Sequence, residues 1–245
     1  MSKILGELFL TGSFIRNSGE SVTFNSHTPL EQCLFIQQII RDNELKRSLE
    51  IGFAHGLSAL AICEAIVKNG GTRHIVIDKF ETTHWSNIGL DLLSKYGYSE
   101  VVDFREAFCY ETLAELILKN ERIDFAYIDS VKQFDWILSD FFLIDKLLTE
   151  NGCIIFDDVS WPGIRRVVRF VSKLQSYKII GTIPVSRINR KRQFLQLLTK
   201  FIPYHQKLFR DDVLITDGDL GINSRCVAFK KIQNDNRNWD WNANF

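Results

Sequence analysis

The chain has 245 residues with 30 basic and 30 acidic side chains, so its formal net charge is zero at pH 7. A balanced charge creates no overall field that would attract nucleic acid or an acidic membrane surface. Hydrophobic residues make up 45% of the chain, which is the usual share for a globular fold. No apolar run approaches the roughly 20 residues that span a bilayer, and the N-terminus shows no signal-peptide pattern. We expect a cytoplasmic protein that binds neither nucleic acid nor membrane.

From residue 48 onward, short apolar segments alternate with amphipathic ones, which predicts a mostly parallel α/β sheet with helices on both faces. The predicted strands are 48–51, 74–77, 101–104, 123–128, 153–156, 177–180 and 226–230. The predicted helices are 30–41, 56–68, 83–96, 111–119, 134–149 and 162–174. Short right-handed crossovers favour a central first strand, with the second and third strands on one side and the fourth and fifth on the other.

A glycine-containing turn, EIGFAHGLS over residues 50–58, joins the first strand to its helix. Gly52 can adopt a backbone conformation that other residues avoid, and Gly56 allows close approach of a ligand. The helix that follows offers free N–H groups and a positive dipole end to a carboxylate or phosphate. Ala54 and Ala59 stand where a dinucleotide fingerprint would have glycines, which disfavours NAD. A tight turn without any ligand remains the alternative interpretation.

Asp78 ends the second strand, where a carboxylate can accept hydrogen bonds from both hydroxyls of a ribose. Such an acid also fits a helix cap or a solvated loop. Together with the glycine turn, it predicts a cofactor that contains adenosine.

Three carboxylates and a lysine follow the fourth and fifth strands: Asp129, Lys132, Asp157 and Asp158. If these strands are neighbours, the carboxylates converge at one edge of the sheet and repel one another unless a cation neutralises them. Oxygen ligands without a nearby His or Cys set favour Mg²⁺ or Ca²⁺ over zinc. The alternative is that Asp157 and Asp158 cap the helix beginning at Pro162.

Together, the turn, Asp78 and the acidic set resemble class I S-adenosylmethionine-dependent methyltransferases. Among these, the chain is similar to the Mg²⁺-dependent small-molecule O-methyltransferases of the catechol and caffeoyl-CoA type. The resemblance covers about residues 48–169. It implies a Rossmann-like, doubly wound, seven-stranded sheet that is mostly parallel, with the last strand antiparallel.

The resemblance also implies roles for individual residues. The cofactor, S-adenosylmethionine, is expected to contact Glu50, Gly52, Phe53, His55, Gly56, Ser58, Asp78 and Asp129. Mg²⁺ is expected on Asp129, Asp157 and Asp158, and Lys132 is expected to act with Asp129 in catalysis, as the general base. These enzymes usually carry an amide where Asp158 stands. The run from Phe134 to Asp158 is closer to a bacterial branch that decorates sugars and antibiotics and allows a second acid there.

The predicted function is metal-dependent O-methylation of a small hydroxylated acceptor. A bound metal would lower the pKa of the acceptor hydroxyl, and Lys132 would take its proton. Two alternatives stay open: a metal-independent N- or O-methyltransferase that uses the same cofactor, and a non-catalytic protein that binds it.

We expect one domain over residues 1–245, with a helical N-terminal segment (1–47) and a cofactor-binding core (48–183). An insertion (184–224) is expected to shape the acceptor pocket or a homodimer contact, because it carries a basic cluster and an amphipathic helix. The last strand and a tail occupy 225–245. The five cysteines are scattered without a CxxC pair, which predicts buried reduced thiols.

Overall fold

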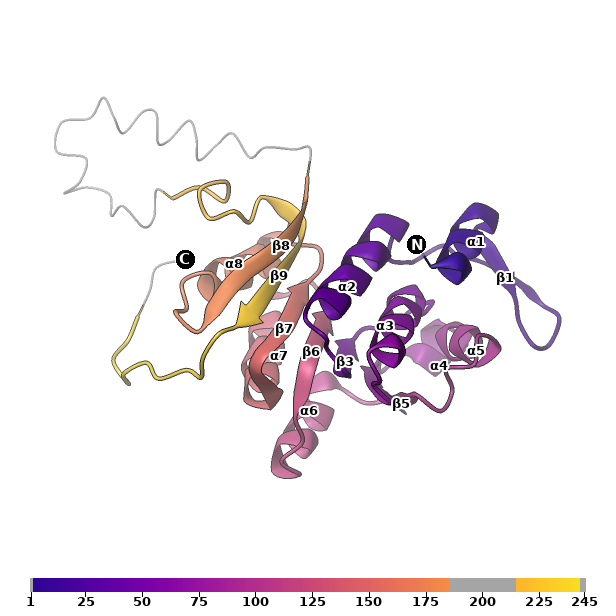
Figure 1. The fold of residues 1–245 in the computed structure, drawn as a ribbon, viewed down its shortest axis with the longest axis horizontal. Coiled ribbons are helices and arrows are strands. Elements are labelled where there is room, and N and C mark those ends of the chain that lie inside the picture. The colour runs from indigo at the N-terminus through magenta and orange to yellow at the C-terminus, as the bar shows by residue number, and fades with distance from the viewer. Residues whose placement is uncertain (1, 186–214, 243–245) are drawn as a thin grey trace.

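The computed structural model describes residues 2–185 and 215–242 and contains a seven-stranded sheet (Figure 1). In spatial order its strands are β5 (Val102–Arg105), β4 (Arg73–Ile77), β3 (Arg47–Ile51), β6 (Ile123–Ile128), β7 (Leu148–Phe156), β9 (Ser224–Lys231) and β8 (Tyr177–Pro184). The first five strands in this order pair in parallel, and β9 runs antiparallel to both β7 and β8. The predicted fold class, strand order and antiparallel last strand are therefore confirmed.

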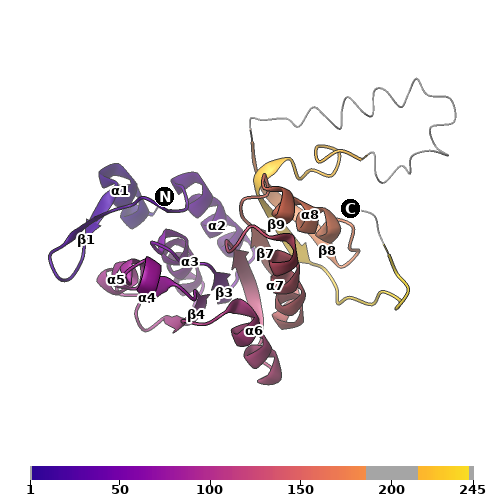
Figure 2. The same ribbon diagram turned by 180° about the vertical axis from the view of Figure 1, so that it is seen from behind.

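Helices cover both faces of the sheet (Figures 1 and 2). On one face lie α2 (Leu30–Asp42) and α3 (Leu57–Lys68), and on the other lie α6 (Cys109–Leu118), α7 (Phe134–Leu147) and α8 (Pro162–Val171). Strand β6 shows how one sequence serves both faces, because neighbouring side chains on a strand point to opposite sides. Phe125 and Tyr127 pack with α2 and α3, whereas Ala126 and Ile128 pack toward α6, α7 and α8.

The N-terminal segment contains more structure than the sequence predicted. Helix α1 (Lys3–Thr11) and a hairpin of β1 (Ser13–Ile15) and β2 (Ser21–Thr23) precede α2. Leu5, Leu8 and Phe14 from this segment are buried in one cluster with Leu57 and Leu60 of α3. This packing fixes the loop that follows β2 above the N-terminal end of α3.

The predicted helix over 83–96 is wrong as a single element. It is replaced by α4 (Glu81–His84) and α5 (Ile88–Lys95), because Ser86 and Asn87 adopt positive φ angles of 52° and 59° that interrupt a helix. The buried carboxyl of Glu81 accepts a hydrogen bond from the N–H of Gly89 at 2.9 Å and so ties the two helices together.

The predicted helix over 134–149 also ends earlier, at Leu147, and β7 starts at the next residue. The amphipathic helix expected within the insertion lies outside the described residues. All five cysteines are buried and free, as predicted.

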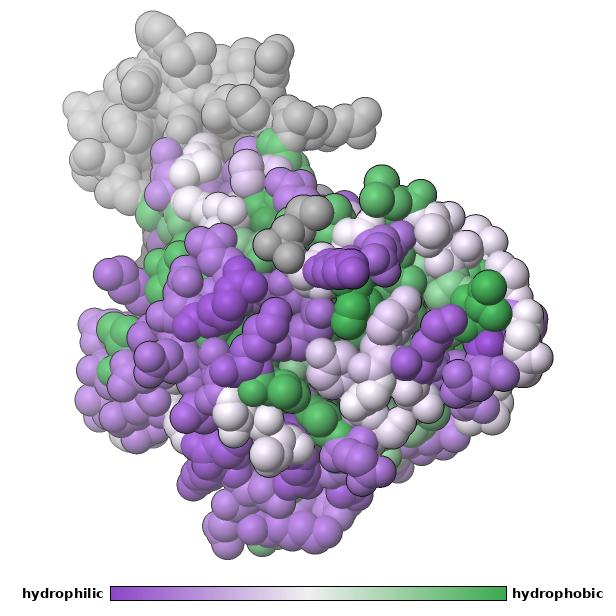
Figure 3. Space-filling model, turned by 45° about the vertical axis from the view of Figure 1, so that its right-hand side comes forward, coloured by the Kyte–Doolittle hydropathy of each residue, from purple (hydrophilic) through white to green (hydrophobic). Residues whose placement is uncertain are grey.

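The surface seen in Figure 3 is mostly hydrophilic, with small separate hydrophobic patches. No helix in the two described ranges is long and apolar enough to cross a membrane.

Candidate active site

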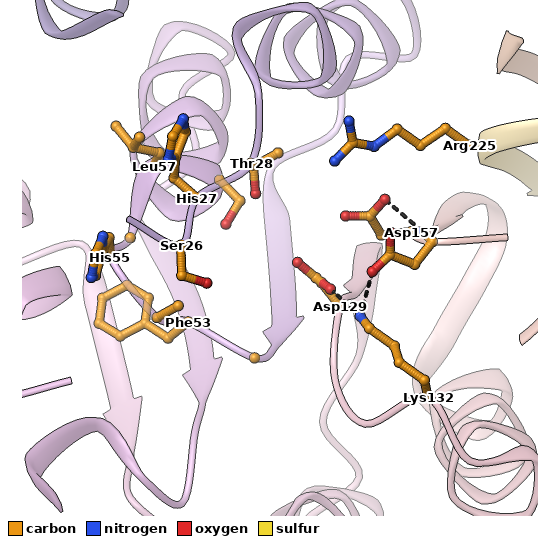
Figure 4. Close-up of a pocket in the computed structure, with 15 residues that line it drawn as sticks. Ser26, His27, Thr28, Phe53, His55, Leu57, Asp129, Lys132, Asp157 and Arg225 are labelled. Atoms are coloured by element: carbon orange, nitrogen blue, oxygen red, sulfur yellow. Dashed lines mark hydrogen bonds and ion pairs between the residues drawn. The ribbon is translucent and has the colours of Figure 1, made fainter. Parts of the chain in front are cut away.

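The carboxyl ends of β3, β6 and β7 surround a cavity of about 250 Å³ at the point where the strand order reverses (Figure 4). Its lining consists of the loop after β2, the glycine turn, the acidic set and one arginine: Ser26, His27, Thr28, residues 52–58, Asp129, Lys132, Asp157, Asp158 and Arg225. Of the residues expected to bind cofactor or metal, only Glu50 and Asp78 are absent from this lining.

Gly52 brings the glycine turn into direct contact with the loop after β6. Its φ is 88°, and a Cβ at this position would overlap the carbonyl oxygen of Asp129. The N–H of Asp129 donates to the carbonyl of Ile51 at 2.9 Å. The turn and the first carboxylate are therefore held at a fixed separation by backbone contacts.

Asp78 lies behind the turn and organises its backbone. One carboxylate oxygen accepts hydrogen bonds from the N–H groups of Phe53 (2.9 Å) and Ala54 (3.4 Å), and the other accepts from Phe80 (2.8 Å). These bonds explain how Ala54 is kept at a positive φ of 47°. The ribose-binding role of Asp78 stays a prediction.

Glu50 is fully buried beside the cavity. Its Oε2 is 3.3 Å from Nε2 of His74, whose Nδ1 is 2.9 Å from the hydroxyl of Ser48. Its Oε1 has no hydrogen-bond partner among the described residues. Burial raises the pKa of Glu50 above its ordinary value, an effect that the hydrogen bond with His74 opposes.

Lys132 lies between two carboxylates of the acidic set (Figure 4). Its ammonium is 2.7 Å from Oδ1 of Asp129 and 2.9 Å from Oδ2 of Asp158. Burial would lower the pKa of Lys132, but these two ion pairs raise it above its ordinary value. Burial, reinforced by the charge of Asp157, raises the pKa of Asp129 to about 7. Lys132 is consequently an ammonium at neutral pH, whereas the pKa of Asp129 is shifted upward toward neutrality.

Asp157 is held by a buried hydrogen-bond chain that no sequence motif predicted. The hydroxyl of Tyr127 donates to its Oδ2 at 2.9 Å, and Nε2 of Gln32 donates to that hydroxyl at 2.6 Å. Its Oδ1 accepts from the N–H of Asp158 at 2.6 Å and from the thiol of Cys226 at 3.3 Å. One feature of the sequence could have indicated this chain: Tyr127 places a polar hydroxyl inside an apolar strand, two residues before Asp129, and a buried hydroxyl needs a hydrogen-bond partner.

The expected Mg²⁺ site is not formed by this arrangement. Among residues 2–185 and 215–242, no group of three His, Cys, Asp or Glu side chains could hold a metal ion. Carboxylate oxygens suit Mg²⁺ chemically, but Lys132 occupies the position between Asp129 and Asp158 where a shared cation would neutralise them. With Lys132 paired to two of them, the three carboxylates do not form a metal site in this arrangement, and their role as Mg²⁺ ligands stays a prediction. The alternative that Asp157 and Asp158 cap α8 is also not observed, because Trp161 is the N-cap and no side chain of the described residues makes a capping hydrogen bond to that helix.

Six lining residues were not predicted as site residues. Ala54 and Leu57 lie within the predicted glycine turn, and four lie outside it: Ser26, His27, Thr28 and Arg225. Of these four, the first three lie between the β2 strand and α2, and Arg225 lies near the start of β9. No motif marks them, because their position depends on how the N-terminal segment and the last strand pack against the sheet.

Comparison with known proteins identifies the segment that carries the turn and the acidic set. Residues 49–159 match the family described as "Methyltransferase domain". This segment is a methyltransferase domain. The match confirms the resemblance to class I methyltransferases drawn from the sequence.

Relatives of the methyltransferase domain include plant O-methyltransferases. "Flavonoid 3',5'-methyltransferase" of Vitis vinifera is 26% identical, over 67% of this chain and 68% of its own length. "Caffeoyl-CoA O-methyltransferase 2" of Zea mays is 27% identical, over 58% of this chain and 56% of its own. "Tapetum-specific methyltransferase 1" of Arabidopsis thaliana is likewise matched over 56% of its length. The chain thus spans little more than half the length of several relatives.

Solved structures agree with the fold of the methyltransferase domain. An O-methyltransferase from Bacillus cereus, solved in complex with SAH, superposes with a TM-score of 0.60 at 19% identity, covering 76% of this chain and 86% of its own. A second structure is the O-methyltransferase TomG from Streptomyces achromogenes, involved in tomaymycin synthesis and solved in complex with SAM. It superposes with a TM-score of 0.55 at 19% identity, covering 64% of this chain and 75% of its own.

Proposed function

We propose that this protein transfers a methyl group from S-adenosylmethionine to the hydroxyl oxygen of a small acceptor. The observation that carries the proposal is the backbone contact between the glycine turn at Gly52 and the loop of Asp129. It joins a cofactor-type turn to an acidic set in one cavity. The names of the plant and bacterial relatives support oxygen as the atom that is methylated.

The cavity lining suits the charges of the cofactor. Helix α3 begins after Gly56 without a side-chain cap, so its first N–H groups are available to the cofactor carboxylate. The unpartnered oxygen of Glu50 is suited to accept a hydrogen bond from the cofactor amino group. A sulfonium is also favoured near Asp129, because the carboxylates outnumber Lys132 and Arg225 in the lining by three to two.

Methyl transfer is an in-line displacement. The acceptor oxygen forms a bond to the methyl carbon while the carbon–sulfur bond breaks, sulfur keeps the electron pair, and the hydroxyl proton leaves. Positioning of the two reactants supplies much of the rate. A base with a pKa near the working pH is the most effective proton acceptor. The pKa of about 7 therefore favours Asp129 as the base, with the Lys132 ammonium orienting it.

A pH–rate profile separates Asp129 from Lys132 as the base. If Asp129 accepts the proton, kcat/KM rises as pH increases through about 7 and Asp129→Asn abolishes that rise. If Lys132 is the base, as expected from the sequence, the rise lies above its ordinary pKa of 10.5 and is lost in Lys132→Met. Binding of S-adenosylhomocysteine should persist in Lys132→Met, since that variant leaves the glycine turn intact.

Metal dependence is a separate proposal with its own test. If Mg²⁺ binds, Asp129, Asp157 and Asp158 would hold it, and it would polarise the acceptor hydroxyl. The ion pairs of Lys132 favour the metal-independent alternative, because they already neutralise two of these carboxylates. Transfer of a labelled methyl group to a panel of catechols, with and without EDTA, decides between the two. Cofactor binding without transfer to any acceptor would support the non-catalytic alternative.

A further inference from the structure

Arg225 is a cation in the cavity without a counterion among residues 2–185 and 215–242. It is partly buried, its backbone carbonyl accepts from the N–H of Val159 at 2.8 Å, and its side chain lines the cavity. No carboxylate of the described residues lies within 4 Å of its guanidinium, although Asp157 and Asp158 line the same cavity. Lys132 already neutralises two carboxylates of the acidic set through its ion pairs. Neutralising that set therefore does not account for the unpaired guanidinium of Arg225.

Hydroxyl groups lie across the cavity from Arg225. Thr28 is buried on the loop before α2, Ser26 is exposed on the same loop, and the hydroxyls of both have no hydrogen-bond partner among the described residues. In Figure 4 the guanidinium of Arg225 extends toward the side of the cavity that Thr28 occupies, away from Lys132. The cavity therefore has an acidic end around Asp129 and a second end that offers hydrogen-bond donors.

We propose that Arg225 and Thr28 form a carboxylate-binding subsite of the methyltransferase cavity. A planar guanidinium donates two parallel hydrogen bonds to a carboxylate, and a hydroxyl can supply a third. A single cation within acidic surroundings matches a singly charged carboxylate better than a doubly charged phosphate. The inference rests on the proposed function, because that reaction supplies two sources of such a group: the amino-acid part of the cofactor and an acidic hydroxylated acceptor.

Two pairs of probes distinguish these sources by calorimetry. S-adenosylhomocysteine and 5′-methylthioadenosine differ in the amino-acid part of the cofactor. The acceptor pair, 3,4-dihydroxybenzoate and catechol, differs only by a carboxylate and is titrated into protein saturated with S-adenosylhomocysteine. Arg225→Gln should weaken the carboxylate-bearing member of one pair by about ten- to a hundredfold, as expected for loss of a hydrogen bond between charged groups. The other member of that pair should bind unchanged.

The control variant is Arg166→Gln, which removes an exposed arginine from α8 outside the cavity lining. It should leave all four affinities unchanged, and Arg225→Lys should recover only part of the loss, because an ammonium lacks the fork geometry. A loss confined to S-adenosylhomocysteine assigns the subsite to the cofactor, and one confined to dihydroxybenzoate assigns it to the acceptor.

The subsite is overturned if Arg225→Gln weakens neither carboxylate-bearing probe, or weakens both members of a pair equally. If the unmodified protein does not bind S-adenosylhomocysteine at all, the proposed function fails instead. That result is distinct from failure of the subsite alone, in which the cofactor product binds and Arg225→Gln has no effect.

Discussion

The buried chain from Gln32 through Tyr127 to Asp157 leads to a prediction that can be worked out from its contacts. Tyr127→Phe removes one hydroxyl, which donates to Asp157 at 2.9 Å and accepts from Gln32 at 2.6 Å. Loss of a hydrogen bond to a charged group costs about 1.5–3 kcal/mol, and a buried amide donor left without a partner costs about 1–3 kcal/mol. We expect the free energy of unfolding to fall by about 2.5–6 kcal/mol, measured by urea denaturation.

Tyr177→Phe is a matched control in the same fold. The hydroxyl of Tyr177 donates to Oδ1 of Asp145 at 2.7 Å, but that oxygen is also 3.1 Å from the ammonium of Lys231. No described residue donates to the Tyr177 hydroxyl, so its removal leaves no buried donor without an acceptor, and the expected cost is smaller, about 1.5–3 kcal/mol. Only Tyr127→Phe should lower methyl transfer, because only Asp157 lines the cavity.

A double-mutant cycle tests the chain directly. Gln32→Leu combined with Tyr127→Phe removes the donor and its acceptor together, so the double variant should lose at least about 1 kcal/mol less than the sum of the single losses. Additive losses, or a loss below about 0.5 kcal/mol in Tyr127→Phe, would refute the reasoning that this hydroxyl satisfies both partners.

Three further changes have defined outcomes. Gly52→Ala should abolish binding of S-adenosylhomocysteine, because the added Cβ would overlap the carbonyl oxygen of Asp129. Gly97→Ala is the control: Gly97 has a similar φ of 81° but open space around it, so this change should lower stability only. Equal binding of S-adenosylhomocysteine by both variants would contradict this prediction. Burial raises the pKa of Glu81 from 4.5 to about 8, so the folded state binds the proton more tightly. Stability should fall as pH rises from about 4.5 to about 8, and Glu81→Gln should flatten that fall in Tm measurements; an equal slope in both proteins argues against it. Lys132→Met leaves the carboxylates of Asp129 and Asp158 without their shared cation. In a calorimetric titration, Mg²⁺ should therefore bind this variant more tightly than the unmodified protein. An unchanged affinity for Mg²⁺ would show that Lys132 does not occupy the position of a shared cation.

The sheet was predictable because its signals are local and its topology is restricted. Strand β6 occupies 123–128 as predicted, since a buried parallel strand is an apolar run ended by a carboxylate. Right-handed crossovers then left few strand orders, and the observed one has β3 in the expected central position. The edge where Asp129 and Asp157 meet follows from that order alone.

What the sequence did not reveal depends on contacts between distant segments. The break at Ser86 and Asn87 interrupts a segment whose apolar spacing resembles one helix. Asp78 is at the predicted strand end, but its hydrogen bonds to the turn backbone depend on the close pairing of β3 with β4. Likewise, Arg225 and Thr28 reach the cavity from opposite ends of the chain, and no local pattern records that meeting.

The most direct test of the proposed function is calorimetric titration of the unmodified protein with S-adenosylhomocysteine, repeated with Mg²⁺ and with EDTA. We predict one binding site per chain, with an affinity that EDTA does not change, because the cofactor contacts proposed for the glycine turn and Glu50 do not involve a metal. No binding under any of these conditions would contradict the proposed function and leave only the fold established.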